Sequence, residues 1–128
     1  MKEITCEWIE KAEKDFRVAK RELTLEPPEY DAVCFHSQQC VEKYLKAVLQ
    51  ENDIYFGKIH ELTPLLEKCI EIIPQLSNFK NELEELSSFA VEIRYPGTTA
   101  DKEDAEECFS TAEKIRRVIR NYFKLPEE

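Results

Sequence analysis

The sequence predicts an all-α protein, folded as an up-down antiparallel bundle of four long helices and one shorter helix. Apolar residues recur with the 3.6-residue period of a helix along most of the chain, and the alternation of a half-buried strand is nowhere sustained. The 128 residues include only two glycines and no low-complexity run. Because long amphipathic helices joined by short connections favour antiparallel neighbours, a bundle is the simplest packing.

Five helices are expected, with proline or glycine at most of the boundaries between them. Thr5 is placed to cap the first helix, and Pro27-Pro28 stops it. Pro74 is expected to end the third helix, and the Arg94-Tyr95-Pro96-Gly97 segment to break the chain after the fourth. The expected ranges are Thr5–Leu25, Asp31–Asn52 with a start as early as Pro28, His60–Ile73, Gln75–Ile93 and Ala100–Lys124.

Apolar stripes on these helices identify the expected core. The stripe of the first helix comprises Trp8, Ile9, Ala12, Phe16, Ala19 and Leu23. The stripe of the fourth helix comprises Leu76, Phe79, Leu83, Leu86, Ala90 and Val91. The last helix opens with acidic residues and closes with basic ones, an order that suits the helix macrodipole.

Length and charge limit the classes of protein that the chain can represent. Its 128 residues, 42% of them hydrophobic, suit a single domain over residues 1–128. The formal net charge of -9 argues against gripping nucleic acid over a whole face, so any such contact must be local. Apolar stretches are too short for a membrane span or a signal peptide, so we expect a cytoplasmic protein with no membrane partner.

The cysteines and histidines predict no metal site and no cofactor. Five cysteines make an odd count, no pair shows C-x-x-C spacing, and no Glu-x-x-His motif occurs. The cysteines in helical patterns are interpreted as reduced, small hydrophobes; these are Cys34, Cys40, Cys69 and Cys108. His36 and His60 are interpreted as structural hydrogen-bonding residues rather than general bases.

The second expected helix has an unusual polar side. At about 100° per residue, this side gathers His36, Gln39, Glu42, Lys43 and Lys46. Phe35 falls among them, and an exposed ring is costly unless a surface covers it. Glu42 and Lys46 are interpreted as a solvated i, i+4 pair that touches nothing else. The candidates for binding a phosphate, a base edge or a partner chain are Phe35, Gln38, Gln39 and Lys43.

The stretch from Phe35 to Ala47, read as F-H-x-Q-Q-x-x-E-K-x-L-K-A, resembles the second helix of the HEPN domain, a small helical module. Two later features are similar to the same family. They are His60-Glu61-Leu62 at the expected start of the third helix and Arg94-Tyr95-Pro96 after the fourth. The resemblance covers nearly the whole chain, and it implies the bundle architecture and pairing into a homodimer.

The resemblance also implies which residues ribonuclease activity would require. HEPN ribonucleases use an arginine followed a few residues later by a histidine, near the start of the last long helix. Arg94 occupies the arginine position, but Thr99, Ala100 and Asp101 stand where the histidine should fall. A threonine hydroxyl does not titrate near neutral pH, and an aspartate would repel the phosphate that Arg94 attracts. Metal-independent RNA cleavage is therefore disfavoured.

Arg94 and Tyr95 are candidate binding residues in their own right, because a loop beside a helix start offers a guanidinium and a ring. Arg94 could contact a phosphate, and Tyr95 could stack on a base. The alternative is that Arg94 pairs with a carboxylate and Tyr95 packs. Thr98 and Thr99 are interpreted as caps of the last helix.

The predicted function is a module that binds a nucleotide or a partner protein. The resemblance implies the partner, since stand-alone HEPN proteins accompany minimal nucleotidyltransferases in toxin–antitoxin-like pairs. A metal-independent HEPN endoribonuclease is the alternative. The expected partners are a second copy of the chain, a minimal nucleotidyltransferase, and a nucleotide or a local stretch of RNA.

Overall fold

The computed structural model describes residues 1–127, and within them the chain forms five α-helices and one 3₁₀ segment, with no strand. The elements are α1 (Glu3–Thr24), α2 (Tyr30–Glu51), α3 (Leu62–Ile70), η1 (Pro74–Phe79), α4 (Lys80–Glu92) and α5 (Lys102–Tyr122). The all-α prediction is confirmed.

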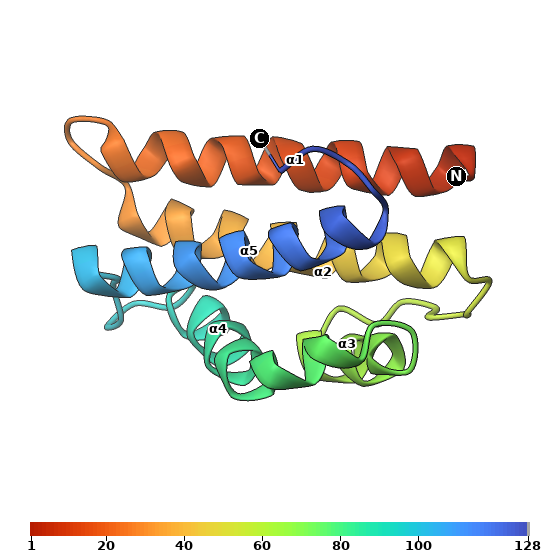
Figure 1. The fold of residues 1–128 in the computed structure, drawn as a ribbon. Coiled ribbons are helices and arrows are strands. Elements are labelled where there is room, and N and C mark those ends of the chain that lie inside the picture. Colours follow the sequence, from red (N-terminus) through yellow and green to blue (C-terminus); the bar gives the residue numbers. More distant parts are fainter. Residues whose placement is uncertain (128) are drawn as a thin grey trace.

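The three long helices α1, α2 and α5 lie alongside one another, and α3, η1 and α4 cover the opposite side of α2 and α5 (Figure 1). α1 and α2 are antiparallel, since the Lys2 N–H at the start of α1 donates to Glu51 Oε1 at the end of α2 at 3.0 Å. α5 runs parallel to α2. This direction follows because the α3–η1–α4 segment crosses the bundle and returns the chain to the start of α2.

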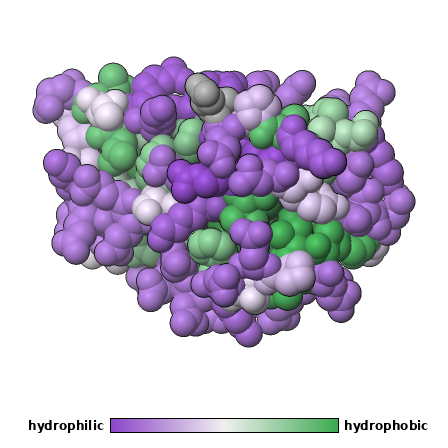
Figure 2. Space-filling view, viewed as in Figure 1, coloured by the Kyte–Doolittle hydropathy of each residue, from purple (hydrophilic) through white to green (hydrophobic). Residues whose placement is uncertain are grey.

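Two hydrogen bonds hold the parallel pair in register. At one end the Ala100 N–H donates to Asp31 Oδ1 at 2.7 Å, and at the other Asn52 Nδ2 donates to the Tyr122 hydroxyl at 3.1 Å. α2 is consequently surrounded by α1, α5 and the α3–α4 layer, and most of its apolar residues are buried, although Phe35 is only half-buried. The face shown in Figure 2 is mostly hydrophilic, and its largest apolar area lies between α5 and the α3–η1 segment.

Several helix boundaries differ from the predicted ones. Thr5 does not cap α1, because the helix begins at Glu3 and the buried Thr5 hydroxyl donates to Glu51 Oε1 at 2.9 Å. α3 begins at Leu62, leaving His60 in the preceding loop, and ends at Ile70. Pro74 starts the η1 segment instead of ending α3, since its fixed φ suits a first helical position.

The fourth helix is shorter than predicted, because η1 takes up its first turns and α4 begins only at Lys80. Val91 was expected in the core but is 51% exposed, whereas its neighbour Ala90 is 1% exposed. Adjacent residues lie about 100° apart around a helix, so only one of the two can point inward here.

The cysteine prediction is confirmed, since Cys34, Cys40, Cys69 and Cys108 are buried as free thiols. Burial raises the pKa of Cys69 to about 12, and its thiol donates to the Leu45 carbonyl at 3.4 Å. Such cysteines act as small packing residues. Among residues 1–127, the structure shows no helix with the length and apolarity to span a membrane.

Candidate functional site

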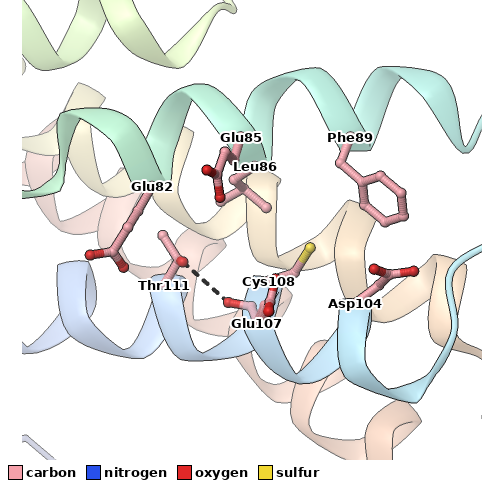
Figure 3. A pocket seen from close by; sticks show the side chains of 8 residues that line it. All are labelled: Glu82, Glu85, Leu86, Phe89, Asp104, Glu107, Cys108 and Thr111. Atoms are coloured by element: carbon pink, nitrogen blue, oxygen red, sulfur yellow. Dashed lines mark hydrogen bonds between the residues drawn. The ribbon is translucent and has the colours of Figure 1, made fainter.

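A cleft of about 200 Å³ lies between α4 and α5 (Figure 3). Its apolar floor is Leu86, Phe89 and Cys108, and carboxylates surround it. The carboxylates are Glu82, Glu85, Asp104 and Glu107. This acidic lining repels phosphate. None of the predicted site residues lines this cleft, so the candidate site is a surface and not a pocket.

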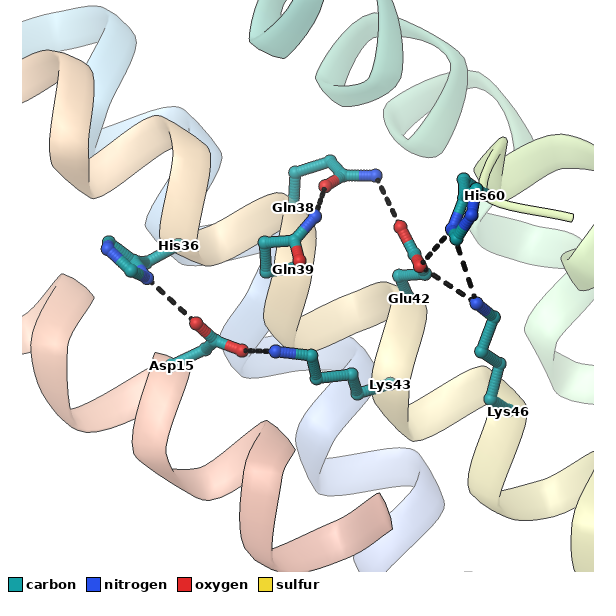
Figure 4. A network of polar contacts seen from close by, with 8 residues as sticks. All are labelled: Asp15, His36, Gln38, Gln39, Glu42, Lys43, Lys46 and His60. Atoms are coloured by element: carbon teal, nitrogen blue, oxygen red, sulfur yellow. Dashed lines mark hydrogen bonds and ion pairs between the residues drawn. The ribbon is translucent and has the colours of Figure 1, made fainter. Parts of the chain in front are cut away.

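The candidate surface is the polar side of α2, which we define as Phe35, His36, Gln38, Gln39, Glu42, Lys43 and Lys46. Figure 4 shows these residues other than Phe35. Its members differ in depth. Phe35, His36, Gln39 and Lys43 are half-buried, whereas Gln38, Glu42 and Lys46 are buried. The outer residues are the ones that a ligand can reach.

Asp15 of α1 connects the outer residues. Its carboxylate lies between His36 Nδ1, at 2.7 Å from Oδ1, and Lys43 Nζ, at 2.5 Å from Oδ2. Only 10% of the Asp15 side chain is exposed, so both contacts are shielded from water. The Lys43 ammonium is thereby fixed in place while 23% of its side chain stays exposed.

The inner residues form a second network. Gln39 Nε2 donates to Gln38 Oε1 at 2.7 Å, and Gln38 Nε2 donates to Glu42 Oε1 at 3.4 Å. Glu42 Oε2 lies 3.0 Å from both Lys46 Nζ and His60 Nδ1. Gln38 therefore lies beneath the surface and supports Gln39.

The interpretation of Glu42 and Lys46 as a solvated pair is wrong. Their side chains are 7% and 4% exposed. The Lys46 ammonium lies 5.4 Å from the Trp8 ring centre and 5.6 Å from that of Phe56. A buried ion pair needs such additional partners, because taking two charges out of water is costly.

Arg94, in the loop after α4, lies over Phe35 of α2. Its Cζ atom is 5.2 Å from the ring centre, a distance at which the guanidinium is attracted to the ring face. The His36 ring also contacts Phe35, edge to face, with ring centres 5.2 Å apart. The structure thus brings together Phe35, Arg94 and His36, while Tyr95 is 65% exposed.

The alternative that Arg94 pairs with a carboxylate receives no support. The ion pairs found within residues 1–127 do not include Arg94. Its guanidinium N–H groups are therefore available to an incoming anion, and its exposed position makes them accessible.

The segment after Arg94 leads directly into α5. Asp101 caps the helix, accepting from the Asp104 N–H at 2.8 Å, and Asp104 accepts in return from the Asp101 N–H at 3.0 Å. The prediction that Thr98 and Thr99 cap the helix is therefore wrong. An aspartate carboxylate bonds a helix N-terminus at least as well as a threonine hydroxyl. The helix start carries carboxylates and no imidazole.

Asp15 was not predicted, although the sequence carries a signal for it. It follows Ala12 by three residues and precedes Ala19 by four, so it lies on the buried stripe of α1. An acidic residue on an apolar stripe requires a partner. Within residues 1–127, no group of three or more His, Cys, Asp or Glu residues is arranged to hold a metal ion.

Comparisons with known proteins identify the family. A family model described as the HEPN domain matches residues 5–122. The chain is 34% identical over 134 residues to "Putative toxin MJ1304" of Methanocaldococcus jannaschii, covering 91% of this chain and 86% of that protein. It also matches the crystal structure of ST0689, an archaeal HEPN homologue, with a TM-score of 0.74 and 26% identity, covering 95% of this chain and 98% of that one. The chain belongs to the HEPN domain family.

Proposed function

We propose that this protein is a HEPN toxin-like module that binds a nucleotide at the surface formed by Phe35, Gln39, Lys43, Arg94 and Tyr95. It would act as the companion of a minimal nucleotidyltransferase in a toxin–antitoxin-like pair. The observation that carries the proposal is the Arg94 guanidinium resting on Phe35 with no carboxylate paired to it in the described chain. The toxin name of the Methanocaldococcus relative supports the biological context.

The chemistry of this surface suits a nucleotide. A guanidinium donates in a fork that matches phosphate oxygens. The Lys43 ammonium is paired with Asp15, and its remaining N–H donors can add a contact to the ligand. Tyr95 offers an exposed ring on which a base can stack. Because Phe35 and Asp15 hold the two cations before a ligand arrives, little side-chain ordering is needed on binding.

Calorimetry with ATP tests nucleotide binding. Arg94→Ala should raise the dissociation constant for ATP about tenfold, because one charge-assisted contact is lost. Arg21→Ala is the matched control, since Arg21 is an exposed arginine of α1 outside this surface. Equal binding by the wild type and Arg94→Ala, or no saturable binding, would remove the nucleotide from the proposal.

The partner proteins need a separate measurement. We expect the chain to form a homodimer in the cytoplasm and to bind a minimal nucleotidyltransferase encoded by a neighbouring gene. Light scattering coupled to size exclusion, with the chain alone and mixed with that enzyme, gives both masses. A monomer that does not bind the enzyme would contradict both expectations.

Metal-independent RNA cleavage is the second candidate, and one contact favours it. His36 lies against Phe35, the same ring that carries Arg94, and Asp15 holds its Nδ1. An imidazole thus lies near the arginine, although not at the position where HEPN ribonucleases have theirs. Single-stranded RNA that stays intact in the presence of chelator and concentrated protein would exclude this activity. Cleavage that is lost in both Arg94→Ala and His36→Ala would support it.

A further inference from the structure

The chain beyond α5 turns back and lies against α1 (Figure 1). Lys124 adopts a φ of 60°, in the left-handed region, and the Leu125 N–H donates to the Arg120 carbonyl at 2.8 Å. The Leu125 side chain is half-buried against the core. We call residues 125–127 the C-terminal strap.

The strap presents oxygen atoms to three arginines of α5. The Pro126 carbonyl accepts from Arg120 Nε, and the Glu127 carbonyl accepts from Arg116 Nη1. The Glu127 carboxylate lies 3.8 Å from Arg117 Nε. Neutral carbonyl oxygens thus accept from guanidinium N–H groups, and the same N–H groups bind an anionic oxygen more strongly than a carbonyl oxygen.

The hollows beneath and beside the strap are rich in cations. Their cationic residues are Lys14, Arg17 and Lys20 of α1 and Arg116, Arg117 and Arg120 of α5. Their carboxylates are Glu10, Glu13, Glu113 and Glu127. Glu13 pairs with both Arg116 and Arg120, and Glu127 belongs to the strap. In a chain with a net charge of -9, this α1–α5 groove therefore carries a local positive excess.

We propose that the α1–α5 groove binds the phosphate backbone of a single-stranded nucleic acid, and that the C-terminal strap closes the groove by standing in for phosphate oxygens. A phosphate displaces a carbonyl because its hydrogen bonds to a guanidinium are charge-assisted. The strap has one apolar anchor, Leu125, and no secondary structure of its own, so it can be released without unfolding α5.

This groove is separate from the nucleotide surface. Its lining comes from α1, α5, the first residue and the strap, whereas Arg94 follows α4 and lies on Phe35 of α2. A local cationic groove also fits an acidic chain, since it neutralises a few phosphates without requiring a basic face. The proposal does not depend on nucleotide binding at Arg94.

Binding of fluorescein-labelled oligouridylate, measured by anisotropy over a range of salt concentrations, tests the proposal. Leu125→Ser removes the anchor and should tighten binding by about tenfold, because affinity scales with the fraction of molecules whose groove is open. Leu25→Ser, at an exposed leucine after α1, is the matched control and should not change binding. A second variant, Glu127→Gln, keeps the anchor and should tighten binding by about twofold.

The Arg117→Gln variant tests whether the α1–α5 groove is the site of oligonucleotide binding. Arg117 is 61% exposed, so this substitution should not disturb folding. In the Leu125→Ser background it should lower the slope of log affinity against log salt by about 0.7, the value for one phosphate contact on a single strand. Lys102→Gln, an exposed cation at the start of α5, should leave the slope unchanged. Unlabelled polyphosphate should displace the oligonucleotide.

Three results would overturn the proposal. The first is equal affinity of the wild type, Leu125→Ser and Glu127→Gln. The second is an equal salt slope for Arg117→Gln and Lys102→Gln. The third is a failure of polyphosphate to compete, which would show that phosphate alone is not what the groove recognises.

Discussion

Two arginines of this protein lie over a phenylalanine ring, and they differ in what else they touch. Arg116 lies 4.4 Å from the Phe16 ring centre and Arg94 lies 5.2 Å from that of Phe35. Arg116 is 9% exposed and donates to both oxygens of Glu13, at 2.8 and 2.9 Å. Arg94 is exposed and has no ion-pair partner in the described residues.

The comparison shows that the ring contact alone does not separate a structural arginine from a binding one. With the strap closed, the guanidinium of Arg116 is saturated by a carboxylate and a carbonyl. The Glu13 contacts hold α5 to α1, and only the Nη1 contact with the strap carbonyl can be exchanged for a phosphate. The guanidinium of Arg94 keeps its fork free, so it can bind an anion. Satisfaction of hydrogen-bond donors is the distinguishing property.

The largest expected effect comes from removing the saturated arginine. Arg116→Ala leaves the Glu13 carboxylate without its bidentate partner and should lower the free energy of unfolding by about 3 kcal/mol. Arg117→Ala, at the adjacent exposed position, should change it by less than about 0.5 kcal/mol. Urea unfolding measures both. Similar values for the two variants would mean that the Glu13 contact does not stabilise the fold.

A smaller loss is expected from the buried pair on the polar side of α2. Lys46→Ala leaves Glu42 buried, with His60 and Gln38 as its remaining partners. This variant should lower the free energy of unfolding by about 2 kcal/mol. Lys43→Ala should cost less, about 1 kcal/mol, because Asp15 keeps His36 and the Lys43 side chain is partly exposed. An equal cost at the two positions would contradict the distinction between inner and outer residues.

The saturated cluster should also be sensitive to acid. Burial by itself would raise the pKa of Glu13, but hydrogen bonds from Arg116 and Tyr44 outweigh it, so the pKa lies below its ordinary value of 4.5. A carboxyl with a lowered folded pKa stabilises the fold above its unfolded pKa, and that stabilisation is lost as the pH falls through the folded value. Urea unfolding from pH 7 down to pH 3 should show a smaller acid-induced loss in Glu13→Gln than in the wild type. Parallel curves would contradict this.

The smallest effect on stability should come from the unsaturated arginine. Arg94→Ala should change the free energy of unfolding by less than about 0.5 kcal/mol, since its guanidinium is solvated and makes no ion pair within the described residues. The same variant is expected to lose nucleotide affinity. A stability loss comparable with that of Arg116→Ala would place Arg94 with the structural arginines.

Part of the site was predictable from the sequence because it depends on local spacing. The helical period places His36, Gln39 and Lys43 on one side of α2, and the loop position of Arg94 follows from Pro96 and Gly97. The contact between Arg94 and Phe35 joins residues far apart in the chain. No local pattern encodes that distance.

Several of the wrong predictions concern contacts between residues that are far apart in the chain. Glu42 and Lys46 have the i, i+4 spacing of a solvated pair, but tertiary packing buries them, with the Trp8 and Phe56 rings beside the Lys46 ammonium. Thr99 and Asp101 both suit a helix cap, and in the structure the Asp101 carboxylate is the group that accepts from the helix N-terminus. Arg116 reads as an ordinary basic residue at a helix end until Glu13 is found beside it.

The amino-acid order by itself determined that the chain is helical, where its main breaks fall, and which family it belongs to. The helical character and the breaks depend on propensity and periodicity, which act over a few residues, whereas the family depends on the resemblance of particular motifs. The tertiary structure alone decided which charges are buried, which arginine is saturated and which is free, and the parallel direction of α2 and α5. The physical reason is that hydrogen-bond satisfaction and burial are properties of neighbours in space, and a chain that crosses the bundle brings distant residues together.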